Sequence, residues 1–132
     1  MNYLVLLGRI FYTAIFIKAG PEHFSSGTIG YAMSKGVPLA QIAVPLSGLI
    51  ALAGGLSILL GYQAKWGAWL IVLFLVPVTL MMHNFWALTD PAAAQLQQIM
   101  FMKNLSMLGA ALIITHFGSG PLSLNDRIKK SA

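Results

Sequence analysis

The sequence predicts an all-α fold, a polytopic membrane protein whose four transmembrane helices form one bundle. Of its 132 residues, 58% are hydrophobic and only 8% are charged, whereas a soluble domain carries charge on about a quarter of its residues. The apolar residues fall into four long stretches, each close to the roughly 20 residues that a helix needs to cross a bilayer. Charged residues lie at the ends of these stretches, with Arg9 and Lys103 as the two exceptions.

The predicted helices form a single domain over residues 1–132 and cover residues 3–19, 39–60, 66–86 and 96–117. Gly20–Pro21 predicts the end of the first helix, because proline lacks a backbone donor and disfavours helical geometry before it. The polar connection that follows is expected to hold one short interfacial helix over Tyr31–Ser34.

Two further patterns predict where the fourth helix begins and how the second helix packs. Asp90–Pro91 is typical of an N-cap followed by a first-turn proline, so the fourth helix is expected to begin there with polar opening turns. In the second helix, Ser47, Ala51 and Gly55 recur every four residues, and such a small-residue face predicts close helix packing.

The positive charges predict an orientation in the membrane. Four crossings place the tail and the connection between the second and third helices on one side, which carries Lys65, Arg127, Lys129 and Lys130. The other side has only Lys35 as a clearly loop-borne cation. Because loops rich in Lys and Arg stay in the cytoplasm, both termini are expected there. The first stretch carries Arg9 in its middle and no basic region before it, so we expect a retained helix and not a cleaved signal.

Composition also argues against several classes of protein. The chain has no cysteine, so it cannot exchange disulfides by itself. No acidic residue falls within the four stretches, which counts against small proton-coupled antiporters. The histidines follow no metal-ligand or haem-ligand spacing, so no metal site is predicted. No basic groove with interleaved aromatic residues predicts nucleic-acid binding, and the basic tail is expected to touch anionic lipid.

Arg9 is the most unusual residue, because an unpaired cation inside a membrane is costly. It lies about 9–12 Å from the helix end, given a rise of 1.5 Å per residue. At that depth an arginine side chain does not easily reach the membrane surface, so Arg9 is expected to face the bundle interior. Two roles stay open: a structural arginine held by carbonyl groups or lipid phosphate, and a contact to a bound ligand.

A second polar set is predicted at the outer side, where His23, His83, Trp86, Lys103 and Asn104 lie near the ends of three helices. We call this predicted set the outer cup, in which His83, Trp86, Lys103 and Asn104 lie close together with His23 or Glu22 above them. A cup of imidazole, ammonium and amide groups over an apolar interior suits the polar head of a quinone. In this interpretation His83 accepts a proton from a quinol hydroxyl and Lys103 stabilises the developing oxyanion. Alternatively, His83 and Trp86 are interface residues and Lys103 extends outward to water.

The order of several short motifs resembles the DoxX family over essentially the whole chain. The matching segments are Arg9 with Lys18–Gly20, Ala53–Gly61, His83–Trp86, Met102–Leu105 and Gly118–Leu124. The resemblance implies a small four-helix protein of the bacterial inner membrane, associated in some relatives with quinone-linked redox complexes. It also places Arg9, His83, Lys103 and Asn104 at motif positions. His23 and Ala51 depart from the pattern, since many relatives carry lysine and glutamate there, and this removes a potential ion pair.

Three functional hypotheses follow. The first is a component of a membrane redox complex that binds a quinone or a partner subunit at the outer cup. The second is a non-enzymatic membrane scaffold or assembly protein, and the third is a small-solute transporter or channel with Arg9 as the selective charge. Whether the chain is an enzyme, which partners it has and whether it forms a homo-oligomer are left open.

Overall fold

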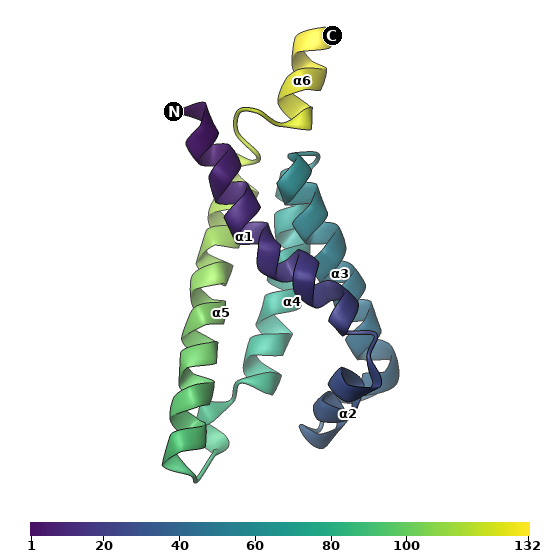
Figure 1. Ribbon diagram of the computed structural model, residues 1–132, viewed down its shortest axis with the longest axis vertical. Helices are drawn as coiled ribbons and strands as arrows, with labels where there is room; N and C mark the ends of the chain where they lie inside the picture. Colours follow the sequence, from purple (N-terminus) through teal and green to yellow (C-terminus); the bar gives the residue numbers. More distant parts are fainter.

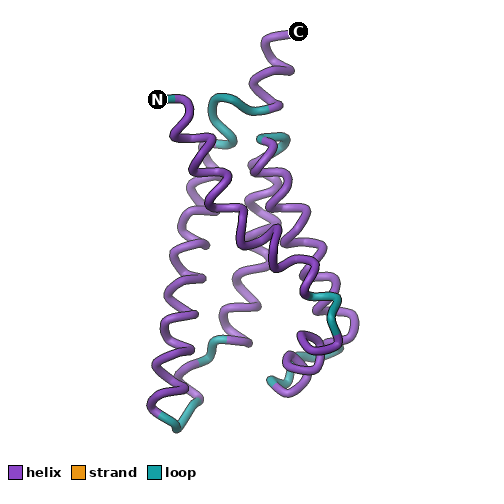
Figure 2. The backbone as a smooth tube through the Cα atoms, viewed as in Figure 1, coloured by secondary structure: helices purple, strands orange, loops and turns teal.

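The computed structural model describes all 132 residues, and its regular secondary structure is entirely helical (Figures 1 and 2). Four helices are long and apolar enough to cross a membrane. The elements are α1 (Asn2–Glu22), α2 (Ser26–Ser34), α3 (Ala40–Leu60), α4 (Ala64–Met82), the 3₁₀ turn η1 (Phe85–Ala87), α5 (Pro91–Phe117) and α6 (Leu124–Ser131). The predicted all-α transmembrane fold is therefore confirmed.

The long helices pack in a row, with α1 against α3, α3 against α4, and α4 against α5. Figure 1 shows α1 crossing obliquely over the α3–α4 pair, with α6 and the N-terminus at one end of the bundle and α2 at the other. The α4–α5 connection lies at the same end as α2. Between α1 and α5 one side-chain hydrogen bond forms, in which the Tyr12 hydroxyl donates to the Met107 carbonyl at 2.8 Å.

Glycines allow close approach where α1 crosses α3 and where α3 crosses α4. A Cβ on Gly48 would lie 2.6 Å from the Gly20 carbonyl oxygen, and one on Gly54 would lie 2.8 Å from the Gly67 carbonyl oxygen. Side chains at these positions would therefore separate α1 from α3 and α3 from α4. The predicted small-residue packing of the second helix is confirmed, with Ala51 and Gly55 buried and Gly48 and Gly54 as further contributors.

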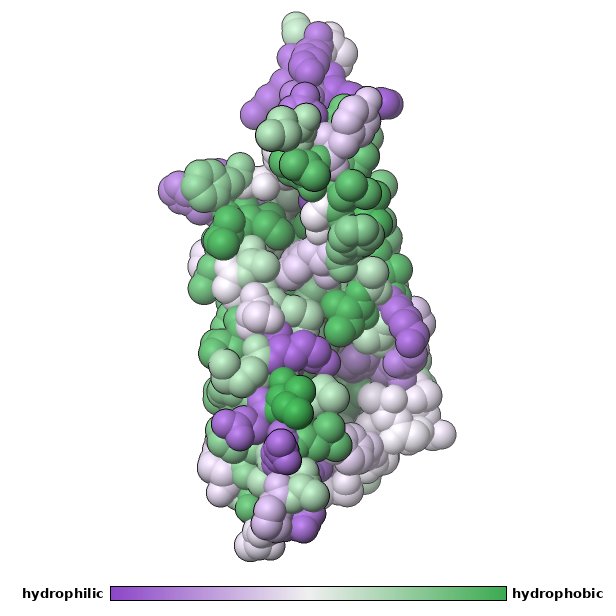
Figure 3. Space-filling view, turned by 60° about the vertical axis from the view of Figure 1, so that its left-hand side comes forward, coloured by the Kyte–Doolittle hydropathy of each residue, from purple (hydrophilic) through white to green (hydrophobic).

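The core lies where these helices cross, and its largest members are Phe16, Ile58, Ile71, Phe74 and Leu75. Large apolar side chains on the outer faces of the same helices are exposed. Figure 3 shows a mostly apolar surface along the bundle, with hydrophilic side chains gathered on α6 and scattered over the opposite half. An apolar outer surface over helices with internally satisfied backbones is what a bilayer requires.

Several predicted boundaries were wrong. The first helix continues through Gly20–Pro21 to Glu22, because Gly20 is a packing residue, and a Cβ at that position would lie only 3.0 Å from that of Leu52. The third ends at Met82, four residues early. The fourth begins at Pro91 with Asp90 as its N-cap, which confirms the Asp90–Pro91 signal and extends the helix before the predicted range of 96–117. The short helix in the polar connection is longer than predicted, because the Ser25 hydroxyl caps it by accepting from the Thr28 amide.

The C-terminal helix α6 was not predicted. The Ser123 hydroxyl accepts a hydrogen bond from the Asp126 amide at 3.1 Å and so begins the helix. The helix is amphipathic. Its apolar residues Leu124 and Ile128 are four residues apart and share one face, and the charged residues Arg127, Lys129 and Lys130 lie between and after them. Such a short charged helix depends on contacts with the bundle, and these contacts involve Arg9.

Candidate functional site

Arg9 is buried in the bundle, with 4% of its surface exposed, so the expectation that it faces inward is confirmed. Its Nη2 atom donates to the carbonyl oxygen of Leu122, in the segment that joins α5 to α6. Its Nε and Nη1 atoms are buried without any hydrogen-bond partner. Two of the three nitrogens of a charged group are therefore unsatisfied, which is costly in a low-dielectric interior.

The surroundings of Arg9 join three parts of the chain. A Cβ on Gly61, at the α3–α4 turn, would collide with Nη1 of Arg9 and with the Ser123 side chain. The Asn125 amide donates to the Gly61 carbonyl at 3.1 Å. Arg9 therefore lies beneath the point where the start of α6 rests on the α3–α4 turn. The sequence did not indicate the Leu122 carbonyl as a partner, because no sequence pattern marks a contact across 113 residues.

At the opposite end, a cavity of about 280 Å³ lies between α2, α3 and α4. We call it the two-histidine pocket. Its lining is mostly apolar and includes two imidazoles, those of His23 and His83, together with Thr28, Ala32, Val37, Ala43, Val44, Ser47, Pro77, Val78, Met81 and Met82. Ser47 donates its hydroxyl hydrogen to the Val44 carbonyl, so it offers an acceptor to the cavity.

His23 is held at the end of α1 by packing and by one hydrogen bond. Its Nδ1 lies 2.8 Å from the Ala19 carbonyl oxygen. Its ring packs edge-on against Phe74, with 5.6 Å between centroids. A Cβ at position 48 would lie 2.6 Å from the His23 Cβ, so the ring can sit there only because that residue is Gly48. A carbonyl accepts only, so Nδ1 carries the hydrogen and Nε2 is an acceptor in the neutral ring.

His83 directly follows the last residue of α4, at the point where the backbone leaves helical geometry. Its Nδ1 lies 2.8 Å from Oε1 of Gln97, on α5. The amide oxygen is an acceptor, so this ring too carries its hydrogen on Nδ1 and presents Nε2 as an acceptor. Neither Nε2 has a partner within the chain. Two histidines whose Nδ1 atoms are bonded in the same way therefore line one cavity.

The predicted outer cup is brought together only in part. His23 and His83 share the two-histidine pocket, whereas Trp86, Lys103 and Asn104 do not line it. Trp86 belongs to an aromatic cluster, with its ring 5.9 Å from that of Phe101. Glu22 is exposed at the end of α1.

Lys103 was expected beside His83, and the structure places it elsewhere. Its side chain is exposed, and Nζ lies 3.5 Å from the Met100 sulfur on the same helix. Gln97 and the buried Asn104 are seven residues apart and share one face of α5. Lys103 is six residues from Gln97, so it points about a third of a turn away. The spacing of Gln97 and Asn104 was the signal that could have identified Gln97 as the partner of His83.

The titratable residues form no group of three His, Asp or Glu side chains that could hold a metal ion. Two imidazoles with their Nδ1 atoms already bonded, in an apolar cavity, suit an organic molecule that carries hydroxyl donors.

Comparisons with known proteins agree with this architecture. The family model described as DoxX matches residues 4–84. The chain is 30% identical to the inner membrane protein YphA of Escherichia coli over 126 residues, which cover 94% of this chain and 89% of YphA. It is 32% identical to the inner membrane protein YqjF of the same organism over 129 residues, covering 96% of this chain and 92% of YqjF. No solved structure matches. With its four membrane-spanning helices, the chain is therefore a multi-pass inner-membrane protein that belongs to the DoxX family.

Proposed function

We propose that this protein binds the head group of a membrane quinol in the two-histidine pocket, as a component of a quinone-linked redox complex. The observation that carries the proposal is the pair of imidazoles, His23 and His83, which line one cavity and whose Nδ1 atoms are both bonded within the chain, so that each Nε2 atom is free to accept from a ligand. A quinol presents two hydroxyl donors, and each imidazole supplies one acceptor.

The size and lining of the cavity support a head group. Its volume of about 280 Å³ is near the lower end for small-molecule pockets, which begin at roughly 300 Å³. It therefore suits one or two rings. A long apolar tail would leave along the lipid-facing surface of the bundle.

The chemistry assigned to the chain is proton acceptance. When a quinol is oxidised, its two hydroxyl protons would pass to the Nε2 atoms of His23 and His83. Its two electrons would pass to an acceptor on a partner subunit, which is why we propose a complex and not an isolated enzyme. Lys103 has no part in this step, because its ammonium is directed to Met100 and outward.

Retention of lipid-soluble ligands tests the proposal. The full chain is purified in mild detergent from a quinone-containing membrane, and its extract is analysed by mass spectrometry. We expect quinone to be retained by the wild type and lost in His23→Ala and His83→Ala. The matched control is His116→Ala, since His116 is exposed near the end of α5, away from the pocket. Equal retention by all variants would contradict the assigned site.

A scaffold is the second candidate, and one observation favours it. Helix α5 packs mainly on α4, with the Tyr12–Met107 hydrogen bond as a link to α1, and little of its membrane-spanning part is buried. A face of this kind is open to another membrane protein. A stable partner that co-purifies with wild type and pocket variants alike, with no quinone retained, would support the scaffold.

We also infer that both termini are cytoplasmic. Lys65, Lys129 and Lys130 lie at the α6 end of the bundle, and positive loops stay inside. A C-terminal reporter that functions only in the cytoplasm should be active, whereas activity of a reporter that functions only in the periplasm would reverse the orientation.

A further inference from the structure

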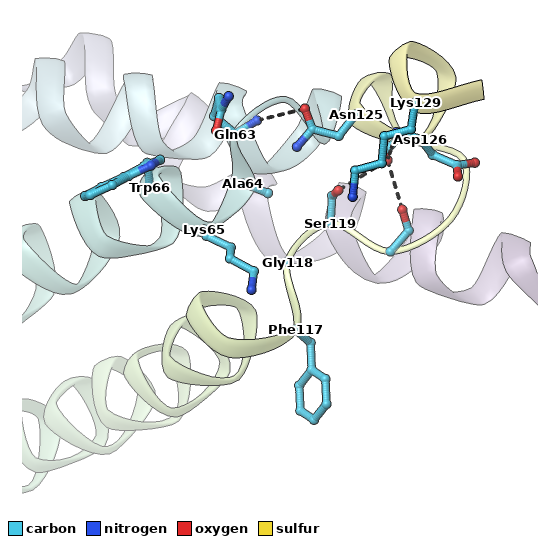
Figure 4. A pocket seen from close by; sticks show the side chains of 12 residues that line it. Gln63, Ala64, Lys65, Trp66, Phe117, Gly118, Ser119, Asn125, Asp126 and Lys129 are labelled. Carbon is cyan, nitrogen blue, oxygen red and sulfur yellow. Dashed lines mark hydrogen bonds between the residues drawn. The ribbon is translucent and has the colours of Figure 1, made fainter. Parts of the chain in front are cut away.

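We propose that the α6 end of the bundle holds a binding site for the phosphate head group of an anionic phospholipid. A second cavity, of about 340 Å³, lies there between the start of α4, the end of α5 and α6. We call it the α6 pocket. Figure 4 shows its lining, which includes Lys65, Trp66, Phe117, Ser119, Asn125 and Lys129.

Two cations are free to meet a ligand in this pocket. Lys65 packs its aliphatic stem over the backbone of Gly118, since a Cβ at that glycine would lie 3.3 Å from Lys65 Cε. Figure 4 shows Lys65 and Lys129 extending toward the Gly118–Ser119 segment from different elements. Neither ammonium has a hydrogen-bond or ion-pair partner; Lys130 forms the chain's one salt bridge.

The pocket has one acidic residue, and that charge is already compensated. Asp126 forms an ion pair with Lys130 at 2.9 Å, and in Figure 4 its carboxylate points away from the cavity. The chain has two other acidic residues, and both lie at the other end of the bundle. Glu22 is the last residue of α1, and Asp90 is the N-cap of α5. The field in the pocket is therefore positive.

Arg9 adds an independent reason for an anion here. Its guanidinium lies behind the pocket wall, against Gly61 and Ser123, and two of its nitrogens are buried without partners. No carboxylate forms an ion pair with it, since Asp126 pairs with Lys130. Because charges interact more strongly at low dielectric, an anion between Lys65 and Lys129 would compensate this buried charge as well as their own.

The rim identifies the anion as a lipid. Trp66 and Phe117 are 71% and 76% exposed beside the pocket. Aromatic side chains at the end of a membrane-spanning helix lie at head-group level, where they would contact the upper acyl chains. Basic pockets between helices at this level are suited to anionic lipid head groups.

Native mass spectrometry of the full chain in neutral detergent tests the site. Phosphatidylglycerol is titrated against phosphatidylcholine, and we expect phosphatidylglycerol to bind more tightly. The double variant Lys65→Gln, Lys129→Gln should weaken that binding roughly 30-fold, the product of two lysine contributions. Both lysines are exposed, so the variant should fold. Lys35→Gln, at the other end, is the control and should leave binding unchanged.

Three results would overturn the proposal. Equal affinity for the two lipids would mean that no anion is recognised. Unchanged phosphatidylglycerol binding in the double variant would place any lipid elsewhere. Inorganic phosphate that competes at the same concentration as phosphatidylglycerol would identify a free anion as the ligand. These outcomes are independent of quinone retention at the two-histidine pocket.

Discussion

The Arg9 guanidinium donates a hydrogen bond to the Leu122 carbonyl, across 113 residues of sequence. This bond ties the first membrane helix to the segment that leads into the C-terminal helix. It turns an otherwise costly intramembrane cation into an anchor for the chain end. Together with the hydrogen bond from the Asn125 amide to the Gly61 carbonyl, it holds the start of α6 against the bundle.

Replacing Arg9 by leucine should release α6 while the bundle stays folded. A hydrogen bond to a charged group contributes roughly 1.5–3 kcal/mol, so the undocked population should rise about tenfold to a hundredfold. Limited trypsinolysis at Arg127, Lys129 and Lys130 would measure this release. Arg9→Lys should restore docking only in part, because the planar fork of donors is lost. A cleavage rate equal to wild type in Arg9→Leu would show that α6 is held by other contacts.

Gly61→Ala should destabilise the same junction. Gly61 has φ of 66°, and a Cβ there would collide with Arg9 and Ser123. Left-handed backbone at a residue other than glycine costs about 1–3 kcal/mol, before the collision is counted. Thermal unfolding in detergent should show a lower midpoint. Gly109→Ala is the control: it has open space around it and should leave the midpoint unchanged or slightly raised.

Gly48→Ala should damage the two-histidine pocket through the α1–α3 crossing. The added methyl would lie 2.6 Å from both the Gly20 carbonyl oxygen and the His23 Cβ, so the helices or the imidazole must move. We expect loss of quinone retention together with a lower unfolding midpoint. Gly8→Ala meets nothing within 4 Å and should preserve both properties. Normal quinone retention in Gly48→Ala would show that the position of His23 is unimportant for the ligand.

Gln97→Leu should weaken quinone binding without removing either histidine. Its Oε1 fixes the His83 ring through a 2.8 Å hydrogen bond, and a bond of this kind contributes roughly 0.5–1.5 kcal/mol. The expected loss is therefore about twofold to tenfold in affinity, measured by titration with a soluble quinol analogue. The neighbouring Gln98 is exposed, so Gln98→Leu should bind as wild type does. Equal affinities in the two variants would remove Gln97 from the site.

The sequence was sufficient for the four membrane helices and for the burial of Arg9, because hydropathy and the cost of a lipid-facing cation act locally along the chain. It misplaced the end of the first helix, since Gly20 is present for contact with α3 and not for termination. It also paired His83 with Lys103 on the basis of similar depth. Depth alone does not bring them together, because the rotation of α5 directs Gln97 to His83 and Lys103 outward.

The contacts that the sequence could not indicate are those of single backbone groups. The Leu122 carbonyl that receives Arg9 and the Ala19 carbonyl that fixes His23 carry no side-chain signature. Only the path of the chain in three dimensions brings them to their partners. The pairing of His23 with His83 in one cavity likewise depends on the packing of α2 against α3.

The most direct test of the proposed function compares the affinities of the reduced and oxidised forms of one soluble quinone analogue. Both imidazoles present acceptors, so the quinol, with two hydroxyl donors, should bind more tightly than the quinone, which has only acceptors. Titration at neutral pH should show this preference in wild type and its loss in His23→Ala and His83→Ala. Tighter binding of the quinone, or a quinol preference that survives both substitutions, would contradict the assignment of the two-histidine pocket.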